Sequence, residues 1–359
     1  MKSQTLFLVL LVVVLSFVAS QSLRAQQLID LGDFGGNGSA AYGINNLNQV
    51  VGAANTSDGF AAAFLYSNGT MTNLGTLGGL NSTAISINDS GEIAGWSEIN
   101  NGQRNVFLYS NGTMTGLGTF GGASSYGYVG GINNSGQIAG GYYSNSSGYH
   151  AVLYSNGTSQ DLGSLGGGGN SIANGINNLG QVVGSSNVGA FIYSNGTLTN
   201  LNVGNGAAAA INNVGQIVGT TSGAFLYSNG TVTDLGALGG NSAFAINDSG
   251  QVVGRLITSG GDTEGFLYST DLGLVNLNTL YASLLVSGTD SQAGFTVLNN
   301  PLAINNSGAI AGSGYYWNGT SSSTQAFLLI PTPEPSTWAL LLGSCGLLAL
   351  VRLRRSSKA

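Results

Sequence analysis

Charged side chains are scarce in this sequence, and basic ones are almost missing from its central part. Only 6% of the 359 residues are Asp, Glu, Lys or Arg, whereas about a quarter is usual in soluble domains. Between Gln26 and Ile330 there are thirteen acidic residues and two basic ones, Arg104 and Arg255, which gives a net charge of −11 (2 − 13). Binding to a phosphate backbone requires clustered Lys and Arg. The composition therefore excludes a nucleic acid as a partner.

Cysteine and histidine each occur once, which removes several kinds of site. Cys345 has no second cysteine for an internal disulfide, and His150 has no second imidazole with which to share a zinc ion. The pairs Asn88-Asp89 and Asn247-Asp248 offer oxygen ligands to calcium, but calcium usually takes six to eight ligands and no dense carboxylate pattern surrounds them. We therefore predict neither a metal site nor a cofactor.

Glycine and apolar residues, in contrast, are abundant. The 60 glycines among 359 residues are more than twice the usual share of about 7%. Apolar residues make up 42% of the chain, and disordered chains normally combine low hydrophobicity with high net charge. The composition predicts a folded protein made of strands and tight turns.

Residues 1–25 have the layout of a secretory signal peptide. Lys2 precedes an apolar run from Leu6 to Val18, and small residues follow as far as Ala25. This run is nearer to 13 residues than to the about 20 that span a membrane, so a retained anchor is the less favoured alternative. We predict export, with cleavage after Ser20 or Ala25.

Residues 331–359 have the layout of a second targeting signal. A proline motif precedes an apolar run and a basic tail, namely Pro333, Glu334 and Pro335, then residues 338–351, then Arg352, Arg354 and Arg355. This arrangement resembles the PEP-CTERM sorting signal of Gram-negative bacteria. The resemblance implies processing by an exosortase in an organism that makes an exopolysaccharide matrix. Fourteen apolar residues span about 21 Å and the basic tail favours the cytoplasmic side, so we expect transient insertion into the inner membrane, with a short permanent anchor as the alternative. Cys345 lies in this apolar run, and no catalytic role is expected for it.

Two short motifs recur seven times between these ends, at intervals of 35 to 58 residues for the first motif. Ile-Asn-Asn or Ile-Asn-Asp begins at Ile44, Ile87, Ile132, Ile176, Ile211, Ile246 and Ile304. Phe-Leu-Tyr or a close variant begins at Phe64, Phe107, Val152, Phe191, Phe225, Phe266 and Phe327. Repeats of this length indicate a solenoid or a propeller.

Each repeat contains two hairpins and no helical periodicity. Around Asn247 and Gly250, two apolar runs flank a turn in which glycine tolerates a positive φ. Around Asn229-Gly230, β-forming residues flank a second turn. Four short strands per repeat predict an all-β, seven-bladed β-propeller of four-stranded blades. The Ala/Gly/Ser-rich strand that ends in Ile-Asn is expected innermost, because only small side chains fit near the axis.

The two ends of the repeat region complete one another. Residues 28–32 read as an outermost strand without a blade, and residues 326–330 read as a third strand without an outermost partner. We therefore predict that residues 26–330 form one propeller, in which the N-terminal outer strand joins the last blade and removes the exposed sheet edges.

At these motifs the repeat resembles the HAF family of extracellular repeats. Its units carry Ala-Phe-Leu-Tyr/Trp, Leu-Gly-x-Leu-Gly-Gly and Ile-Asn-x-x-Gly-Gln-Ile/Val-x-Gly, and the resemblance extends from about Leu28 to Ile330. It implies an extracellular protein that is commonly paired with this type of sorting signal. It supplies no catalytic residues.

Other motifs have simple structural explanations. Asn-Gly-Thr formally matches a glycosylation signal but fits hairpin turns better, at Asn68, Asn111, Asn156, Asn195, Asn229 and Asn318. His150 is interpreted as a variable loop residue rather than a general base. A pair of acids for glycoside cleavage stays open, because thirteen carboxylates are present and the sequence gives no distances.

Three function classes remain, in decreasing order of preference. They are a non-catalytic structural or adhesive protein of the cell surface or exopolysaccharide matrix, a glycan-binding propeller, and a polysaccharide-active hydrolase or lyase. Glycan binding needs exposed aromatic rings, and the best local cluster is Tyr126, Tyr128, Tyr142, Tyr143 and Tyr149. Partners are expected at the variable loops on one side of the ring, which are residues 96–105, 119–128, 141–150, 255–264 and 276–302.

Overall fold

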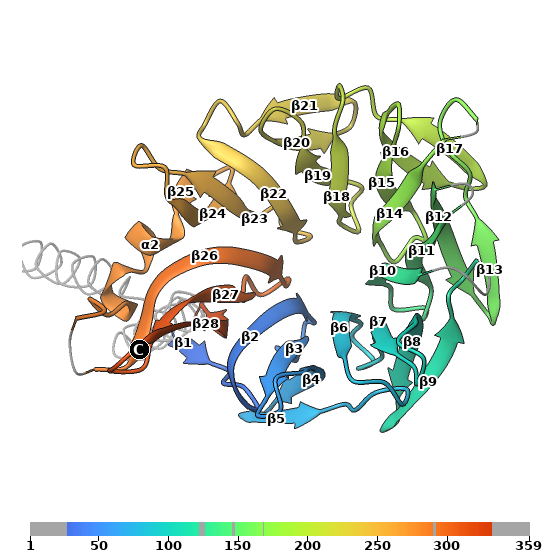
Figure 1. Cartoon of the computed structure of the whole chain (residues 1–359). Coiled ribbons are helices and arrows are strands. Elements are labelled where there is room, and N and C mark those ends of the chain that lie inside the picture. The colour runs from blue at the N-terminus through green and yellow to red at the C-terminus, as the bar shows by residue number, and fades with distance from the viewer. Residues whose placement is uncertain (1–26, 122–125, 146–147, 168, 290–291, 332–359) are drawn as a thin grey trace, which may run out of the picture. The chain divides into compact units, whose positions relative to one another are not determined.

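Short antiparallel strands make up almost all of the structure. The computed structural model describes residues 27–121, 126–145, 148–167, 169–289 and 292–331, and Leu28–Leu329 form one compact unit. The described residues contain 28 strands and two short helical segments. The strands form seven sheets of four strands each, arranged in a ring (Figure 1). The predicted all-β, seven-bladed propeller is confirmed.

Six blades use four consecutive strands each, and they follow one another along the chain. Blade 1 contains β2 (Gly35–Ile44), β3 (Val50–Thr56), β4 (Ala61–Ser67) and β5 (Thr70–Asn73). Blade 2 contains β6 (Ser82–Ile87), β7 (Ile93–Glu98), β8 (Arg104–Ser110) and β9 (Thr113–Gly118). Blade 3 contains β10 (Tyr126–Ile132), β11 (Ile138–Ser144), β12 (Gly148–Ser155) and β13 (Thr158–Asp161).

Blade 4 contains β14 (Ser171–Ile176), β15 (Val182–Ser186), β16 (Gly189–Ser194) and β17 (Thr197–Asn200). Blade 5 contains β18 (Ala207–Ile211), β19 (Ile217–Thr220), β20 (Ala224–Ser228) and β21 (Thr231–Asp234). Blade 6 contains β22 (Gly240–Ile246), β23 (Val252–Ile257), β24 (Thr263–Ser269) and β25 (Gly273–Asn276). Blade 7 contains β26 (Gly294–Ile304), β27 (Ile310–Trp317), β28 (Ser322–Ile330) and the N-terminal β1 (Gln27–Asp30).

The two hairpin turns form for the reasons that the sequence suggests. Between β6 and β7, Asn88 Oδ1 accepts the backbone N–H groups of Ser90 and Glu92 at 3.1 and 2.9 Å, while Gly91 adopts a φ of 79°. Between β4 and β5, Asn68 and Gly69 both have positive φ, at 51° and 81°. Two successive positive φ angles fit the right-handed twist of the flanking strands.

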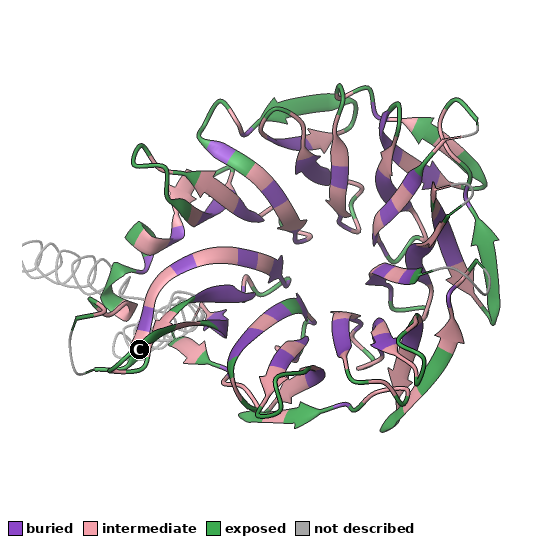
Figure 2. Ribbon diagram, viewed as in Figure 1, coloured by how far each residue is buried: buried purple, intermediate pink, exposed green. Residues whose placement is uncertain are grey.

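The core lies between the blades, where aromatic rings of the third strands are fully buried. In blade 1, the Phe64 ring packs against Gly52 of the second strand, where a Cβ would lie only 2.7 Å from the ring. The same Phe-on-Gly pairing recurs in blades 2, 4, 5 and 6. In Figure 2 the buried residues gather on the middle strands and the exposed ones on outermost strands such as β13 and β21.

The N-terminal strand closes the ring as predicted. The sheet order β1-β28-β27-β26 places β1 as the outermost strand of blade 7. Just beyond β1, Leu31 donates its backbone N–H to the Ala326 carbonyl at 3.0 Å. Gln325 then binds Asp33 Oδ2 and the Ser39 hydroxyl, at 2.9 and 2.8 Å. Residues near both ends of the propeller therefore hold the last blade together.

The inner strands are bulkier than predicted. Tyr42, Phe244 and Leu302 lie in first strands and line the axis, so the expectation of uniformly small residues there is wrong. Seven blades leave open space along the axis, which these side chains partly fill. Between blades 6 and 7 the chain also forms α2 (Leu277–Leu280) and η1 (Ala282–Leu284), which the sequence did not indicate.

Candidate functional site

The two faces of the ring carry different connections. Because successive strands of a blade are antiparallel, the turns after the first and third strands emerge on one side, the turn face. Connections after the second strand and between blades emerge on the other side, the loop face. These range from residues 187–188 in blade 4 to residues 277–293 between blades 6 and 7. The described parts of the five variable segments noted in the sequence lie at the loop face or in the strands beside it, and the segment 276–302 continues into the inner strand β26.

Exposed apolar side chains concentrate on the loop face. Fifteen large apolar residues are exposed within the described ranges, and nine of them lie in loop-face connections or at the strand ends beside them. Four others lie in turns of the turn face. The nine are Phe60, Leu80, Tyr126, Tyr149, Val188, Leu238, Ile257, Leu280 and Tyr315.

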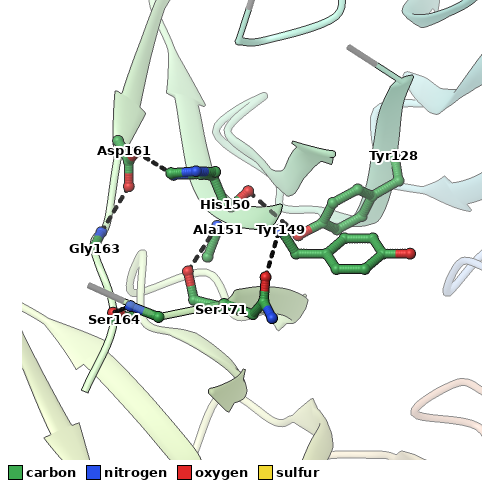
Figure 3. A network of polar contacts seen from close by, with 10 residues as sticks. Tyr128, Tyr149, His150, Ala151, Asp161, Gly163, Ser164 and Ser171 are labelled. Carbon is green, nitrogen blue, oxygen red and sulfur yellow. Dashed lines mark hydrogen bonds and ion pairs between the residues drawn. The ribbon is translucent and has the colours of Figure 1, made fainter. Parts of the chain in front are cut away.

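Four of the five candidate tyrosines lie together on one surface of blade 3. Tyr126, Tyr143 and Tyr149 are register partners across β10, β11 and β12. The Tyr143 and Tyr149 ring centroids are 4.9 Å apart, and Tyr128 meets Tyr149 edge-on at 6.3 Å. Tyr126 and Tyr149 are 53% and 42% exposed. We call these four residues the tyrosine cluster, of which Figure 3 shows Tyr128 and Tyr149.

Tyr128 is the fixed base of this cluster. Its hydroxyl donates to the His150 carbonyl at 3.4 Å, and its ring lies over Gly141, where a Cβ would come within 2.4 Å of the hydroxyl. Burial raises the pKa of Tyr128 above its ordinary value, so the hydroxyl stays a neutral donor. The backbone N–H of Tyr149 donates to Asn170 Oδ1 at 2.8 Å. The exposed rings therefore stand on a rigid support.

Tyr142 lies on the opposite surface of blade 3, because side chains alternate along β11. Its ring stacks on His150 at 4.6 Å and an interplanar angle of 1°. His150 Nδ1 lies 3.0 Å from Asp161 Oδ2 (Figure 3). Partial burial, together with the nearby charge of Asp161, raises the pKa of Tyr142. The placement of His150 in a variable loop was wrong: it lies in strand β12 and packs against Tyr142.

Two chambers lie along the axis of the ring, and the sequence did not reveal them. The turn-side chamber, of about 160 Å³, is lined by the Ile-Asn-Asn or Ile-Asn-Asp motifs of all seven blades. The loop-side chamber, of about 210 Å³, is lined by the inner strands just before these motifs. Six of the seven Ile residues, all except Ile246, line both chambers and therefore lie at the boundary between them.

The first Asn of each motif bonds its blade to the next one. Asn133 donates Nδ2 to the Asn177 carbonyl at 3.0 Å and to Gln137 Oε1 at 2.8 Å, while its Oδ1 accepts two backbone N–H groups of its own turn. The same bond to the next carbonyl occurs in every blade at 2.9 to 3.0 Å. We call these buried residues the inner Asn ring: Asn45, Asn88, Asn133, Asn177, Asn212, Asn247 and Asn305.

One signal in the sequence pointed to this ring. A turn alone accepts Asp, Ser or Asn, yet all seven copies of the motif carry Asn at its second position. The Asn amide accepts two hydrogen bonds of the turn on Oδ1 and donates two from Nδ2, as at Asn133, whereas a carboxylate donates none and a hydroxyl only one. Strict repetition of Asn therefore indicates bonding between blades.

The third residue of each motif forms a second ring of hydrogen bonds. Its Oδ1 accepts the backbone N–H of the corresponding residue in the preceding blade, at 2.8 to 3.0 Å, around the whole circle. Asp89 and Asp248 each accept two further amide donors on Oδ2. Partial burial opposes ionisation, but these hydrogen bonds outweigh it and lower the pKa of both carboxyl groups. Two negative charges therefore face the turn-side chamber at neutral pH.

The described residues show neither a cluster of metal ligands nor a membrane-spanning helix. Within residues 27–331, apart from the four short gaps in the described chain, no group of three or more His, Cys, Asp or Glu side chains is placed to hold a metal ion. No helix in the described part of the chain is long and apolar enough to cross a membrane. The signal peptide expected at residues 1–25 and the motif Pro333, Glu334 and Pro335 lie outside the described residues.

No family model matches the chain, and no curated protein does. Three solved structures are similar to this chain at low sequence identity. A chain of a mitotic checkpoint complex is 15% identical, with 86% of this chain and 94% of the other covered and a TM-score of 0.48. YCF48 bound to a D1 peptide is 12% identical, with 86% and 97% covered and a TM-score of 0.48. XC5397, a gluconolactonase from Xanthomonas campestris, is 11% identical, with 88% and 93% covered and a TM-score of 0.38. At such low identity none of them indicates an activity for this chain.

Proposed function

We propose that this chain is an exported, non-catalytic adhesive protein of the cell surface or exopolysaccharide matrix of a Gram-negative bacterium. The observation that carries the proposal is the tyrosine cluster, which presents aromatic rings to solvent from a rigid, closed scaffold. The resemblance to HAF repeats and to a PEP-CTERM signal supports export and processing by an exosortase. The scarcity of basic side chains in the propeller and its net charge of −11 support a neutral rather than an anionic partner, such as a neutral polysaccharide.

Glycan binding is the second candidate, and the same cluster favours it. Aromatic rings stack on the apolar faces of sugar rings, and nearby polar groups fix their orientation. Tyr126 and Tyr149 offer the rings, and the Asn170 side chain lies beside them.

A polysaccharide-active hydrolase or lyase is the weaker alternative. Burial raises the pKa of Asp30, but this carboxyl lies in the closing region near Asp33 and Tyr316 rather than in either chamber.

Cosedimentation with exopolysaccharide isolated from the producing bacterium tests adhesion. We expect the purified chain to sediment with the polysaccharide, and the double variant Tyr126→Ser and Tyr149→Ser to lose most of this binding. The matched control makes the same kind of exchange on the turn face, at Leu47→Ser and Leu179→Ser, which are 67% and 71% exposed. Equal loss in both double variants would refute adhesion through the cluster. Release of new reducing ends from the polysaccharide would refute a non-catalytic role.

Fractionation of cells tests the sorting signal separately. Replacing Pro333, Glu334 and Pro335 by alanine should block processing and leave the chain in the inner membrane, in a host that carries an exosortase. Exchanging the neighbouring Ser336 and Thr337 for alanine serves as the control and should leave release unchanged. Normal release of the triple variant would contradict the proposed processing without affecting the adhesion test.

A further inference from the structure

One position of the inner strand differs in every blade. It lies two residues before the Ile of each motif and lines the loop-side chamber. The residue after it is always Gly, Ala or Ser, and the following Ile and Asn are the same in all seven blades. No two blades share a residue type at this position. We call the seven side chains the lining ring: Tyr42, Ile85, Gly130, Asn174, Ala209, Phe244 and Leu302.

Filling the axis does not explain this diversity. The boundary between the chambers is made by one residue type, Ile, in six of the seven blades. The lining ring instead combines large residues with Gly130 and Ala209, and a chamber of about 210 Å³ remains. Different side chains on a repeated backbone form an asymmetric pocket, in which most lining side chains are apolar while polar atoms make up the larger part of the accessible wall. Such a pocket suits a ligand that presents both hydrogen-bonding groups and an apolar face.

Two polar groups in the ring are available to a ligand. Asn174 donates Nδ2 to the Ala208 carbonyl at 2.8 Å, which fixes the amide. Its Oδ1 accepts no hydrogen bond from the described residues. Burial raises the pKa of Tyr42, and the Tyr42 hydroxyl likewise makes no hydrogen bond to any described residue. The chamber therefore offers one amide oxygen and one neutral hydroxyl.

Phe244 supplies a fixed aromatic wall. The guanidinium of Arg255 lies over its ring, at 5.3 Å from the centroid. Arg255 is itself held by Asn300 Oδ1 at 2.7 Å. This positive charge disfavours a cationic ligand at the ring, although aromatic walls elsewhere attract cations.

Size and charge select among ligand classes. Drug-sized ligands occupy pockets of about 300–1,000 Å³, so a chamber of about 210 Å³ suits a single small ring. The lining contains no charged side chain, and Asp89 and Asp248 place negative charge beyond the Ile boundary. An anionic ligand is therefore disfavoured as well.

We propose that the loop-side chamber binds one neutral sugar ring, the terminal unit of a glycan that enters from the loop face. The apolar face of the sugar packs on Phe244 and the aliphatic residues of the ring. Its hydroxyl groups bond to Asn174 Oδ1 and to the Tyr42 hydroxyl. This site is separate from the tyrosine cluster, so it goes beyond the proposed adhesion.

Saturation-transfer NMR and calorimetry on the full chain test the proposal. The probes are the methyl glycosides of glucose, mannose and galactose, with glucuronate and choline as charged comparisons. We expect at least one neutral glycoside to bind and neither charged probe to do so. Ala209→Leu fills the chamber and should weaken binding by about tenfold or more, because the ligand loses its space. Asn174→Ala should weaken it by about fivefold, the equivalent of one ordinary hydrogen bond.

The matched control is Tyr126→Ser, which changes the tyrosine cluster and leaves the chamber intact. It should keep full affinity for the glycoside, and a melting curve of each variant shows that the ring is folded. The proposal is overturned if no neutral glycoside binds, if only a charged probe binds, or if folded Ala209→Leu binds like the parent. Loss of glycoside binding in Tyr126→Ser alone would move the sugar site to the cluster. Loss of matrix adhesion with intact glycoside binding would refute only the proposed function.

Discussion

The turn side and the loop side of this ring follow opposite rules. On the turn side, seven blades repeat the same Ile-Asn motif, and two circles of hydrogen bonds join each blade to the next. On the loop side, connections differ in length, exposed apolar residues gather, and the lining ring uses seven different residues. Sequence repetition thus coincides with bonding between blades, and sequence divergence with the surfaces available to a partner. Changes on the turn side should reduce stability, whereas changes on the loop side should reduce binding.

The largest effect is expected where the ring closes. Deleting residues 28–32 removes the outermost strand of blade 7 and the buried Leu31, and it exposes the edge of β28 beside Phe327. An exposed edge in a ring that is otherwise closed also removes cooperativity between neighbouring blades. We expect the melting temperature to fall by about 10 °C or more, measured by circular dichroism.

A synthetic peptide provides the matched control for this deletion. A peptide with the sequence of residues 27–33 should restore part of the lost melting temperature, and the same residues in scrambled order should not. An unchanged melting temperature in the deleted chain would show that the ring does not depend on its N-terminal strand.

A single change in the inner Asn ring should have the next largest effect. Asn133→Ala removes the bonds to the Asn177 carbonyl and to Gln137 and leaves buried backbone groups of the turn without their acceptor. Loss of a buried, fully bonded amide typically destabilises by about 2–4 kcal/mol. Urea unfolding measures the change. Ser135→Ala in the same turn is the control and should stay within about 0.5 kcal/mol. Equal effects of the two variants would mean that the ring bonds add little.

The sequence predicted the fold because local rules and closure agree. Asn68-Gly69 and Asn88 with Gly91 specify hairpins by their own backbone preferences, and residues 28–32 fit the one blade that lacked a strand. The chambers could not be predicted, because an axial space depends on how seven blades approach one another. Tyr42 and Phe244 show this limit: they occupy strands that were expected to be uniformly small.

The tyrosines illustrate the same limit at the candidate site. Their position in one repeat was visible in the sequence, and side-chain alternation would have separated Tyr142 from Tyr143 once the strand was known. The stacking of Tyr142 on His150, however, depends on the register of β11 against β12. Sequence neighbours were therefore grouped although they serve different surfaces.

Tyr142 and Tyr143 are neighbours in the sequence but lie on opposite surfaces of blade 3, so variants of the two residues test stability and binding separately. Tyr143→Ser removes a ring of the tyrosine cluster and should reduce polysaccharide binding several-fold. Tyr142→Ser removes the stack on His150 and the ring beside Asp161, and it should lower stability by about 1 kcal/mol while binding stays within twofold of the parent. Cosedimentation and urea unfolding measure both properties in each variant. The opposite pattern would place the adhesive surface on the Tyr142 side of blade 3.

The smallest effect concerns the two aspartates of the turn side. Hydrogen bonds, acting against partial burial, lower the folded-state pKa of Asp89 and Asp248. Their stabilising contribution is therefore present above the unfolded value of about 3.9 and is lost as the pH falls through the folded pKa. Asp30 acts in the opposite direction, because burial raises its pKa. Both aspartates are only partly buried, so solvent and salt keep their effect small.

The double variant Asp89→Asn and Asp248→Asn isolates this contribution. In the parent, Oδ2 of each carboxylate accepts two amide N–H donors from the two neighbouring blades. The Nδ2 group of an Asn in the same place cannot accept them, so the variant should melt below the parent at pH 7. As the pH falls from 7 to 3 towards the folded pKa of the two carboxyl groups, the parent begins to lose the ionised acceptors, and the gap between the two melting temperatures should narrow. Asp58→Asn, in an exposed loop-face connection, is the control and should melt like the parent at both pH values. A gap of equal size at pH 7 and pH 3 would show that the charge of the two carboxylates does not stabilise the ring, and that only the geometry of their oxygens matters.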